Sequence, residues 1–442
     1  MPDVVVVGAG VVGAACAYYA ARAGLDVVVV DRGAVAGGTT GAGEGNLLVS
    51  DKEPGPELDL ALLSNRLWRD LAGTGTAGGA GGADGSDGSD GTDGSGAGGS
   101  RGGAGNGPAG GPSTSTSTGT GTGSGPVGDG PGFEPGGGFE YEAKGGLVVA
   151  ETDEILATLT GLAARQGVEH VAVAPGELGD YEPHLAKGLA GGVFYPQDAQ
   201  VQPMLAAARL IRRGAERFGH GALMLRTGVT VTGFVRDGGR VAGVTTDHGD
   251  ILAGAVVNAA GTWGGEIAAL AGVRVPILPR RGFILVTEPL AGPLIRHKVY
   301  TAAYVTAVAS DAEGLETSAV VESTPAGPVL IGASRERVGF DRTVSVPVLE
   351  RLARQAVELF PALAAYRAIR AYCGFRPYCP DHLPVIGEDP RAPGLYHACG
   401  HEGAGIGLAP ATGHLIAQLL AGLRPDLDLS PFRPDRFAGE VS

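Results

Sequence analysis

The stretch "VVVVGAGVVGAACAYYAARAGLDVVVVD", residues 4–31, decides the fold of this chain. It opens with four valines, and such a continuous β-branched run is typical of a parallel strand that is buried on both faces. Three glycines with the spacing GxGxxG follow, then a helical pattern that ends at Gly24 and a valine-rich run over residues 26–30. The stretch therefore predicts a strand–helix–strand unit that begins an α/β domain.

The glycine spacing also predicts what this unit binds. Gly8 permits the tight turn, Gly10 lets backbone amides approach a pyrophosphate, and Gly13 lets the helix pack closely on the strand. Asp31 closes the second strand, where a carboxylate accepts hydrogen bonds from a ribose 2′-hydroxyl and disfavours NADP. The motif predicts a dinucleotide site, although it does not separate FAD from NAD, and a ligand-free tight turn is the alternative.

The composition indicates an acidic protein with a large core. The 442 residues are 43% hydrophobic, the net charge is −14 and the isoelectric point is about 5.1. This charge argues against nucleic acid or an anionic membrane as the main partner. Four cysteines are too few for a secreted disulfide scaffold. The chain contains no Cys-x-x-Cys pair, the spacing that would suggest a bound metal. Because the N-terminus lacks the pattern of a signal peptide and no run of 18 apolar residues occurs, we expect a cytoplasmic protein without a transmembrane segment.

Residues 73–138 differ from the rest of the chain. They contain "ADGSDGSDGTDGSG" and "PSTSTSTGTGTGSG" with almost no large apolar side chains, so we expect a disordered insert. The Asp-Gly-Ser repeats lack the recurring apolar residue that a calcium-binding repeat needs. The insert lies between a helical pattern and a strand pattern, and lengthening a surface loop tenfold costs only about 2 kcal/mol in closure entropy. The fold on either side can therefore be continuous in space.

The remaining chain alternates between helical and strand patterns, which predicts a mixed α/β protein. Helical patterns lie near residues 153–166, 203–218, 346–359 and 411–420. Strand patterns lie near residues 229–235, 241–246, 255–258, 283–287, 319–322 and 329–333.

Two further glycine-rich turns point to a flavin. In "DILAGAVVNAAGTWGGEIAALAG" a strand runs into a small-residue turn that would let the backbone pass close to a dinucleotide. In "YHACGHEGAGIGLAPATGHLIAQLLAG" four glycines precede a helix that has Pro410 near its first turn. Free amides and the positive helix end gather there and would stabilise negative charge on a reduced flavin. An ordinary strand–helix turn and a glycine-rich helix cap are the respective alternatives.

Together with "CGFRPYCPDHLPVIG", these stretches resemble the glycine oxidase/D-amino-acid oxidase/sarcosine oxidase (DAO) family of FAD-dependent oxidoreductases. The stretch "GTTGAGEGNLLVSDK" is more specifically similar to flavoprotein subunits of multi-component dehydrogenases, of the hydrogen cyanide synthase, opine oxidase and hydroxyproline or proline dehydrogenase types. The resemblance covers nearly the whole chain outside the insert.

The resemblance implies a Rossmann-type FAD-binding domain, of the glutathione-reductase-like kind, and a substrate domain built on an antiparallel sheet. The FAD-binding domain would comprise residues 1–72, 201–272 and 370–442, and the substrate domain residues 139–200 and 273–369. The flavin would lie at their interface. Sarcosine oxidases attach flavin through a cysteine near this element, but Gly374 takes that place here and Cys373 misses it by one residue. We therefore expect non-covalent FAD.

By the same resemblance, the FAD would be held along three segments of the chain. The implied cofactor-binding residues are Gly8, Gly10, Val11, Val12, Gly13, Asp31, Arg32, Thr39, Thr40, Gly43, Glu44, Gly45, Asn46, Val231, Ala260, Gly261, Gly374, Arg376, Gly400, His401, Glu402, Gly403, Ala404, Gly405, Ile406 and Gly407.

The implied chemistry is oxidation of a C–N bond by hydride transfer to flavin N5, with Arg376 as a clamp for the substrate carboxylate. A structural salt bridge is the alternative for Arg376. Tyr300 and Tyr304 are candidates for direct or indirect contact with the substrate, although a tyrosine of the core or the surface is the favoured interpretation of each. His401 is expected as a flavin contact rather than an essential base. The charge of Arg335 is expected to be solvated, and Glu44 receives no specific role.

The sequence thus favours an amino- or imino-acid dehydrogenase of small substrates such as D-amino acids, glycine, sarcosine, proline, hydroxyproline or opines. An oxidase that uses O₂ is one alternative, and a non-catalytic flavin-binding subunit is another. Because the chain has no iron–sulfur motif, a dehydrogenase would need an external acceptor, such as an iron–sulfur or second flavoprotein subunit. Neither a metal nor a disulfide between Cys373 and Cys379 is expected.

Overall fold

The computed structural model of the protein describes residues 1–74, 135–217 and 223–437. Most of the insert predicted for residues 73–138 therefore lies outside the described residues. The chain on either side of it is held together by Arg213, whose Nη1 donates to the carbonyl of Leu71 at 2.8 Å and whose Nη2 donates to that of Gly137 at 2.6 Å. The described chain thus resumes beside the point where it stops, as the sequence predicted for a surface loop.

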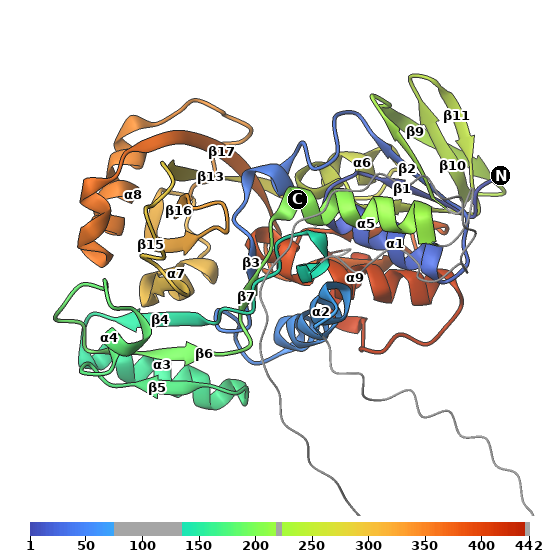
Figure 1. The fold of residues 1–442 in the computed structure, drawn as a ribbon. Coiled ribbons are helices and arrows are strands. Elements are labelled where there is room, and N and C mark those ends of the chain that lie inside the picture. The colour runs from blue at the N-terminus through green and yellow to red at the C-terminus, as the bar shows by residue number, and fades with distance from the viewer. Residues whose placement is uncertain (75–134, 218–222, 438–442) are drawn as a thin grey trace, which may run out of the picture. The chain divides into compact units, whose positions relative to one another are not determined.

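The first motif forms the centre of a six-stranded sheet with the order β18-β19-β12-β1-β2-β8. Figure 1 shows β1 and β2 of this sheet near α1 (Val11–Arg22), which packs on them. All neighbours are parallel except the edge pair β18 and β19. The strands are β1 (Val4–Val7), β2 (Val27–Asp31), β8 (Leu223–Thr227), β12 (Ala255–Asn258), β18 (Val385–Glu388) and β19 (Leu395–Cys399).

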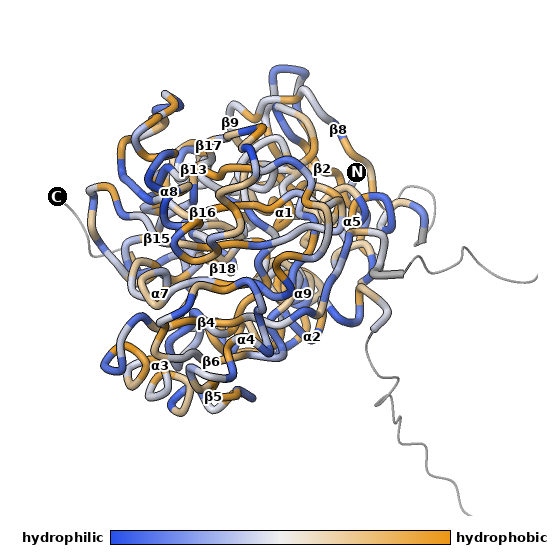
Figure 2. Tube along the Cα trace, turned by 60° about the vertical axis from the view of Figure 1, so that its left-hand side comes forward, coloured by the Kyte–Doolittle hydropathy of each residue, from blue (hydrophilic) through white to orange (hydrophobic). Residues whose placement is uncertain are grey.

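The valine runs are continuous because both faces of this sheet are covered. Val4 and Val6 pack in one core cluster together with the helices, whereas Val5 and Val7 pack in another that contains Val244. The helices on the first face include α1 (Val11–Arg22), α2 (Pro56–Ala72), α5 (Pro203–Arg217) and α9 (Gly405–Leu420). The second face is covered by the three-stranded sheet β9 (Val231–Asp237), β10 (Arg240–Thr246) and β11 (Gly249–Leu252) and by α6 (Gly264–Leu270). In Figure 2 the trace of α1 is mostly hydrophobic, as expected for a helix that packs on several elements.

A second, eight-stranded sheet has the order β17-β13-β16-β15-β14-β4-β6-β5 and is antiparallel except where β14 meets β4. Its strands are β4 (Gly146–Ala150), β5 (Val171–Val173), β6 (Gly191–Tyr195), β13 (Leu278–Thr287), β14 (Lys298–Thr301), β15 (Glu316–Ser323), β16 (Val329–Arg335) and β17 (Ala368–Tyr378). The α-helices that belong to it are α3 (Asp153–Gln166), α4 (Leu178–Tyr181), α7 (Ala302–Val308) and α8 (Val346–Leu359). A small ribbon pairs β3 (Asn46–Leu47) with β7 (Ala199–Gln200).

Short 3₁₀ turns connect these elements. They are η1 (Thr39–Ala42), η2 (Pro135–Gly138), η3 (Gly261–Trp263), η4 (Pro361–Ala365), η5 (Glu402–Ala404), η6 (Ser430–Phe432) and η7 (Pro434–Phe437). The edge strand β17 reaches the turns that belong to the first sheet, because its carbonyl at Phe375 accepts hydrogen bonds from Thr39 Oγ1 at 2.7 Å and Thr262 Oγ1 at 2.8 Å. The eight-stranded sheet is thereby fixed to η1, which follows β2, and to η3, which follows β12.

These sheets confirm the predicted fold class, and most predicted elements occur within a few residues of their expected bounds. The last helix is an exception, because α9 begins at Gly405 rather than near residue 411 and contains Pro410 in its interior. Proline lacks the N–H that would bond to the carbonyl of Ile406. The indole Nε1 of Trp68 in α2 donates to this carbonyl at 3.2 Å and to that of Gly407 at 3.1 Å, so the helix continues through the proline.

In the part of the chain that the structure describes, no helix is long and apolar enough to cross a membrane. The four cysteines, Cys16, Cys373, Cys379 and Cys399, are free thiols.

Candidate functional site

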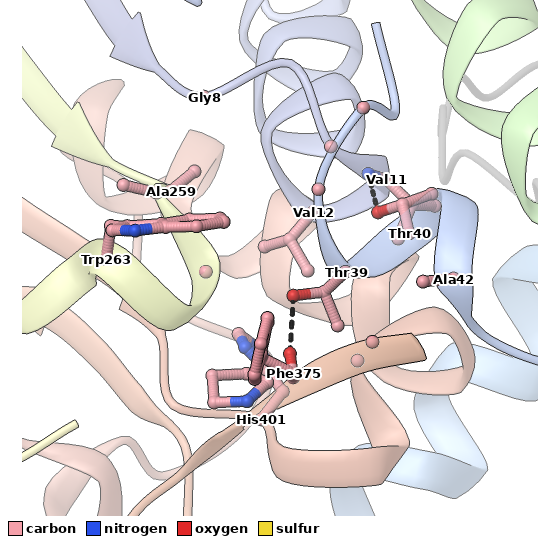
Figure 3. Close-up of a pocket in the computed structure, with 18 of the residues that line it drawn as sticks. Gly8, Val11, Val12, Thr39, Thr40, Ala42, Ala259, Trp263, Phe375 and His401 are labelled. Atoms are coloured by element: carbon pink, nitrogen blue, oxygen red, sulfur yellow. Dashed lines mark hydrogen bonds between the residues drawn. The ribbon is translucent and has the colours of Figure 1, made fainter. Parts of the chain in front are cut away.

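A cavity of about 750 Å³ lies where the two sheets meet. It is lined by the turn after β1, the end of β2, the segment around η1, the start of β9, the turn after β12, the end of β17 and the segment around η5. Figure 3 shows this arrangement, with Trp263 beside Ala259 and with Thr39, Phe375 and His401 gathered below. Segments far apart in the sequence therefore form one elongated site.

The glycines of the first motif allow neighbouring backbone segments to approach one another closely at the wall of the cavity. A Cβ at Gly8, whose φ is +113°, would lie 2.4 Å from the carbonyl oxygen of Ala259. A Cβ at Gly13 would lie 1.9 Å from the carbonyl oxygen of Gly8, so only glycine lets α1 start this close to β1. Gly8 and Gly10 line the cavity, whereas Gly13 lies behind it in the helix–strand contact. These positions fit the backbone approach that a pyrophosphate requires.

One end of the cavity is formed by Asp31 and its neighbours. The carboxylate of Asp31 accepts hydrogen bonds from the backbone N–H groups of Ala9 and Gly33, each at 2.7 Å. Arg32 lies with its guanidinium 4.4 Å from the ring centre of Trp263, and both line the cavity. A carboxylate held this way keeps lone pairs for a ribose hydroxyl, so this end fits the adenosine half of a dinucleotide.

The middle of the cavity is held in shape by two threonines. Thr40 Oγ1 accepts a hydrogen bond from the backbone N–H of Val11 at 3.0 Å, and Thr39 Oγ1 donates to the carbonyl of Phe375 (Figure 3). These bonds connect η1 to the first turn of α1 and to β17. Side chains and backbone groups of η1 can therefore contact a ligand that spans both sheets.

Arg376, on β17, also lines the cavity. Its Nη1 donates to the carbonyl of Ser334 at 2.8 Å, and no carboxylate of the described residues forms an ion pair with it. Gly282 makes room for it, because a Cβ there would lie 2.4 Å from Nη1. Burial, together with the charge of Arg335, lowers the pKa of Arg376 to about 10, so the side chain remains a cation at neutral pH. An unpaired cation facing a cavity is a site for an anion.

The two predicted tyrosines lie in different places. Tyr304 lines the cavity, with the guanidinium of Arg335 4.7 Å from its ring centre. Tyr300 lies behind it, fully buried, and its hydroxyl is hydrogen-bonded to that of Ser50. Tyr300 therefore does not line the cavity. The prediction of a solvated Arg335 is wrong, since only 3% of this residue is exposed and its charge packs on Tyr304.

His401 and Glu402 line the cavity beside Arg376. Burial lowers the pKa of His401 to about 3, so the ring is neutral at physiological pH, and Nε2 is hydrogen-bonded to Thr412 Oγ1 at 3.0 Å. Glu402 forms an ion pair with the fully buried Arg280 at 2.6 Å and is hydrogen-bonded to His382 Nδ1 at 3.1 Å. Although burial raises the pKa of Glu402, the hydrogen bond from His382 and the charge of Arg280 outweigh it and hold the pKa below its ordinary value. The negative charge of Glu402 is thus already compensated by Arg280.

Most of the residues predicted from the sequence line this cavity. Those that do are Gly8, Gly10, Val11, Val12, Asp31, Arg32, Thr39, Thr40, Gly43, Glu44, Asn46, Val231, Ala260, Gly261, Gly374, Arg376, Tyr304, His401, Glu402, Gly403, Gly405 and Ile406. Those that do not are Gly13, Gly45, Tyr300, Gly400, Ala404 and Gly407.

Several residues that line the cavity were not predicted from the sequence, among them Trp263, Phe375 and Arg342. Trp263 follows the small-residue turn after β12, and stacks on Phe340 with the ring planes 5° apart. Phe375 lies between the predicted Gly374 and Arg376, so the Gly-x-Arg-Pro element contained the signal.

In the described ranges, no group of three or more histidine, cysteine or acidic side chains could hold a metal ion.

Comparison with known proteins gives consistent matches. The sequence profile of the family described as DAO, FAD dependent oxidoreductase, matches residues 3–79 and 133–419. The chain is 33% identical over 253 residues to glycine oxidase of Pseudomonas aeruginosa, an alignment that covers 57% of this chain and 64% of that protein. It is 28% identical over 316 residues to hydrogen cyanide synthase subunit HcnC of P. aeruginosa, covering 68% and 69% respectively.

A solved structure has a similar fold. L-proline dehydrogenase from P. horikoshii superposes with a TM-score of 0.77 at 22% identity, covering 100% of this chain and 99% of that chain. The sequence alignment with the P. aeruginosa glycine oxidase, by contrast, spans slightly less than two thirds of that protein.

Proposed function

The chain belongs to the DAO family of FAD-dependent oxidoreductases, and on that premise we propose that it oxidises the C–N bond of a small amino or imino acid. The cavity fits FAD, with the adenosine half at Asp31 and Val231, the pyrophosphate at Gly8 and Gly10, and the flavin near Arg376. When bound, FAD accepts the hydride that leaves the substrate carbon. We also propose the division into FAD-binding and substrate domains that the resemblance implies.

We propose that the FAD is bound without a covalent link. Successive residues of a strand point to opposite faces of the sheet. Gly374 lines the cavity, and a Cβ there would lie 2.8 Å from that of Ala42, whereas the neighbouring Cys373 packs on the cluster beneath the other face of the eight-stranded sheet. Its thiol is therefore directed away from the proposed flavin site.

The observation that carries the proposed function is the unpaired Arg376. A guanidinium fork matches a carboxylate in bidentate fashion, and this one lines the cavity without an ion pair to any described acid. A substrate carboxylate held there would be oriented by β17, a strand fixed through Phe375 to both threonine-bearing turns. Orientation of the reacting carbon is the main contribution that a protein makes to such a reaction.

The test is anaerobic flavin reduction by the FAD-loaded protein against glycine, sarcosine, proline, hydroxyproline, D-amino acids and opines. Arg376→Ala should raise KM for the reducing substrate about 10- to 100-fold, the loss expected for a hydrogen-bonded charge, with little change in the flavin spectrum. Arg342→Ala removes an exposed cation that also lines the cavity and should have a smaller effect. Unchanged kinetics in Arg376→Ala would contradict the clamp.

We further propose that the protein is a dehydrogenase that passes its electrons to a partner subunit or another external acceptor. The similarity to a hydrogen cyanide synthase subunit supports a partner subunit, whereas the similarity to a glycine oxidase supports the alternative, an oxidase that uses O₂. Mixing the reduced protein with air-saturated buffer separates the two, because an oxidase would reoxidise rapidly and a dehydrogenase would not.

A further inference from the structure

Glu44 is a buried carboxyl group in the wall of the cavity whose bonding is incomplete. Only 7% of the residue is exposed. Its Oε2 accepts a hydrogen bond from Asn46 Nδ2 at 3.0 Å, but Oε1 is buried without any hydrogen-bond partner. Gly332 provides the space for Oε1, because a Cβ there would lie 2.6 Å from it. A buried carboxylate oxygen without a partner is costly, so such an atom suggests a donor that arrives with a ligand.

The charges around Glu44 do not balance. Lys298 Nζ lies 3.4 Å from Glu44 Oε2 and 2.6 Å from Glu322 Oε2, so one buried lysine serves two buried carboxyl groups. Glu322 is the better neutralised of the two, because its Oε1 also accepts a hydrogen bond from the backbone N–H of Gly45 at 3.1 Å. Burial raises the pKa of Glu44 above its ordinary value, as expected when the negative charge is only partly compensated. The excess of negative charge therefore lies at Glu44.

The opposite imbalance lies at Arg376, which lines the same cavity. Both residues line the cavity and attract each other electrostatically, yet they form no ion pair. One unpaired cation and one incompletely bonded carboxylate are complementary to a ligand that carries both charges. An amino acid is such a ligand, with its carboxylate at Arg376 and its ammonium group at Glu44.

We propose that Glu44 binds the ammonium group of the substrate and accepts its proton before hydride transfer. This inference rests on the proposed function. The N–H bond of the ammonium breaks, the proton forms an O–H bond with Glu44, and the electron pair stays on nitrogen. With FAD bound, that pair would form the C=N bond as the hydride leaves the carbon, and FAD would be the acceptor of the two electrons that the substrate loses. A carboxyl group with a raised pKa is a stronger base for this step than an exposed one.

Several titratable groups face Glu44 from the elements packed around it. They are Lys298 on β14, Glu322 on β15, Tyr372 and Arg376 on β17, and Tyr304 on α7. Burial, as the first cause, raises the pKa values of both tyrosines above 10, and Arg376 and Lys298 remain cations at neutral pH. Among these groups, Glu44 therefore determines how proton acceptance depends on pH on the acidic side, because the tyrosines stay neutral there and Arg376 and Lys298 stay charged.

The test is the pH profile of kcat/KM for flavin reduction in FAD-loaded Glu44→Gln. In the parent protein kcat/KM should fall as the pH drops through the raised pKa of Glu44, because only the carboxylate accepts a proton. In Glu44→Gln kcat/KM at pH 7 should drop about 10²- to 10⁴-fold, the usual contribution of a general base. The remaining activity should rise with pH toward the pKa of the substrate ammonium group itself, where the amine is neutral without help.

Three controls separate this role from a structural one. Binding of acetate, a carboxylate without an amino group, measured by the change it causes in flavin absorbance, should be unchanged in Glu44→Gln and weakened in Arg376→Ala. Glu57→Gln makes the same chemical change at an acid that pairs with Lys52 at 3.4 Å outside the cavity, and should keep the parent profile. Glu44→Asp keeps a carboxylate and should keep the acidic limb of the profile at a reduced rate.

The outcomes are distinguishable. A Glu44→Gln variant with the parent rate and profile overturns the assignment, as does one whose rate falls equally at every pH, or a Glu57→Gln variant with the same loss. If no amino or imino acid reduces the flavin of the parent protein, the proposed function fails and the inference fails with it. If the parent is reduced and only the Glu44 result is negative, the proposed function stands.

Discussion

At the scale of single residues, the site depends on positions where even a methyl group does not fit. Gly13 is the most constrained of the first motif, because a Cβ would lie 1.9 Å from the carbonyl oxygen of Gly8 and 3.3 Å from the side chain of Ala259. The backbone cannot move away without separating α1 from β1. The close contact between the first turn of α1 and the end of β1 therefore helps to determine the shape of the cavity, which Gly8 lines.

Gly13→Ala should lower the free energy of unfolding by about 1–3 kcal/mol, as expected for an overpacked core, and reduce the amount of FAD that purifies with the protein. The matched control is Gly161→Ala in α3, where the nearest atom to a new Cβ is 3.7 Å away. That change should raise stability by about 0.5–1 kcal/mol through helix propensity. Denaturant unfolding and the ratio of absorbance at 450 and 280 nm measure both effects; equal behaviour of the two variants would disprove the steric argument.

The sequence predicts such residues when they belong to a local pattern and misses them when they do not. Gly8, Gly10 and Gly13 share one turn, so their spacing alone indicates their positions. The place of Arg335 depends instead on the packing of Tyr304, which lies on another element, and its charge was wrongly expected to be solvated. The surroundings of Glu44 likewise come from β14 and β15, so no local pattern could reveal them.

At the scale of elements, the contact between α2 and α9 explains how a helix contains a proline. Trp68 Nε1 donates to the carbonyls of Ile406 and Gly407, and Ser64 Oγ accepts the hydrogen bond of the Ala411 N–H at 3.3 Å. Because proline is common near a helix start, the predicted start of α9 was several residues too late. The N–H donor that compensates for Pro410 comes from Trp68 in α2, over 330 residues away in the chain, so no local pattern indicated it.

Trp68→Phe should cost about 1–3 kcal/mol of stability, because it leaves the partly buried carbonyl of Ile406 without a donor. In a Pro410→Ala background the new backbone N–H can supply that hydrogen bond, so the same Trp68→Phe change should cost less. A double-mutant cycle measured by denaturant unfolding gives the difference and removes the contribution of lost ring packing. An identical cost in both backgrounds would show that the indole N–H does not compensate for the proline.

At the scale of the whole molecule, the described residues that flank residues 75–134 lie close together in space. Arg213 donates to both Leu71 and Gly137, so the two sides of this stretch already lie together before any connection is considered. Replacing residues 75–134 by a short Gly/Ser linker should therefore leave the melting temperature and the FAD content nearly unchanged, since closure entropy depends weakly on length. Thermal unfolding of the shortened protein measures this, and a large destabilisation would contradict it. A variant that also carries Arg213→Ala should be less stable.

The adjacency of Leu71 and Gly137 has a practical consequence. The first 74 residues supply β1 and β2, which lie between β12 and β8 of the later chain in one sheet. Neither part can complete that sheet without the other. Two separately translated fragments, divided at this point, would have to reassemble before flavin could be retained, and the yellow colour of the product would then report their complementation.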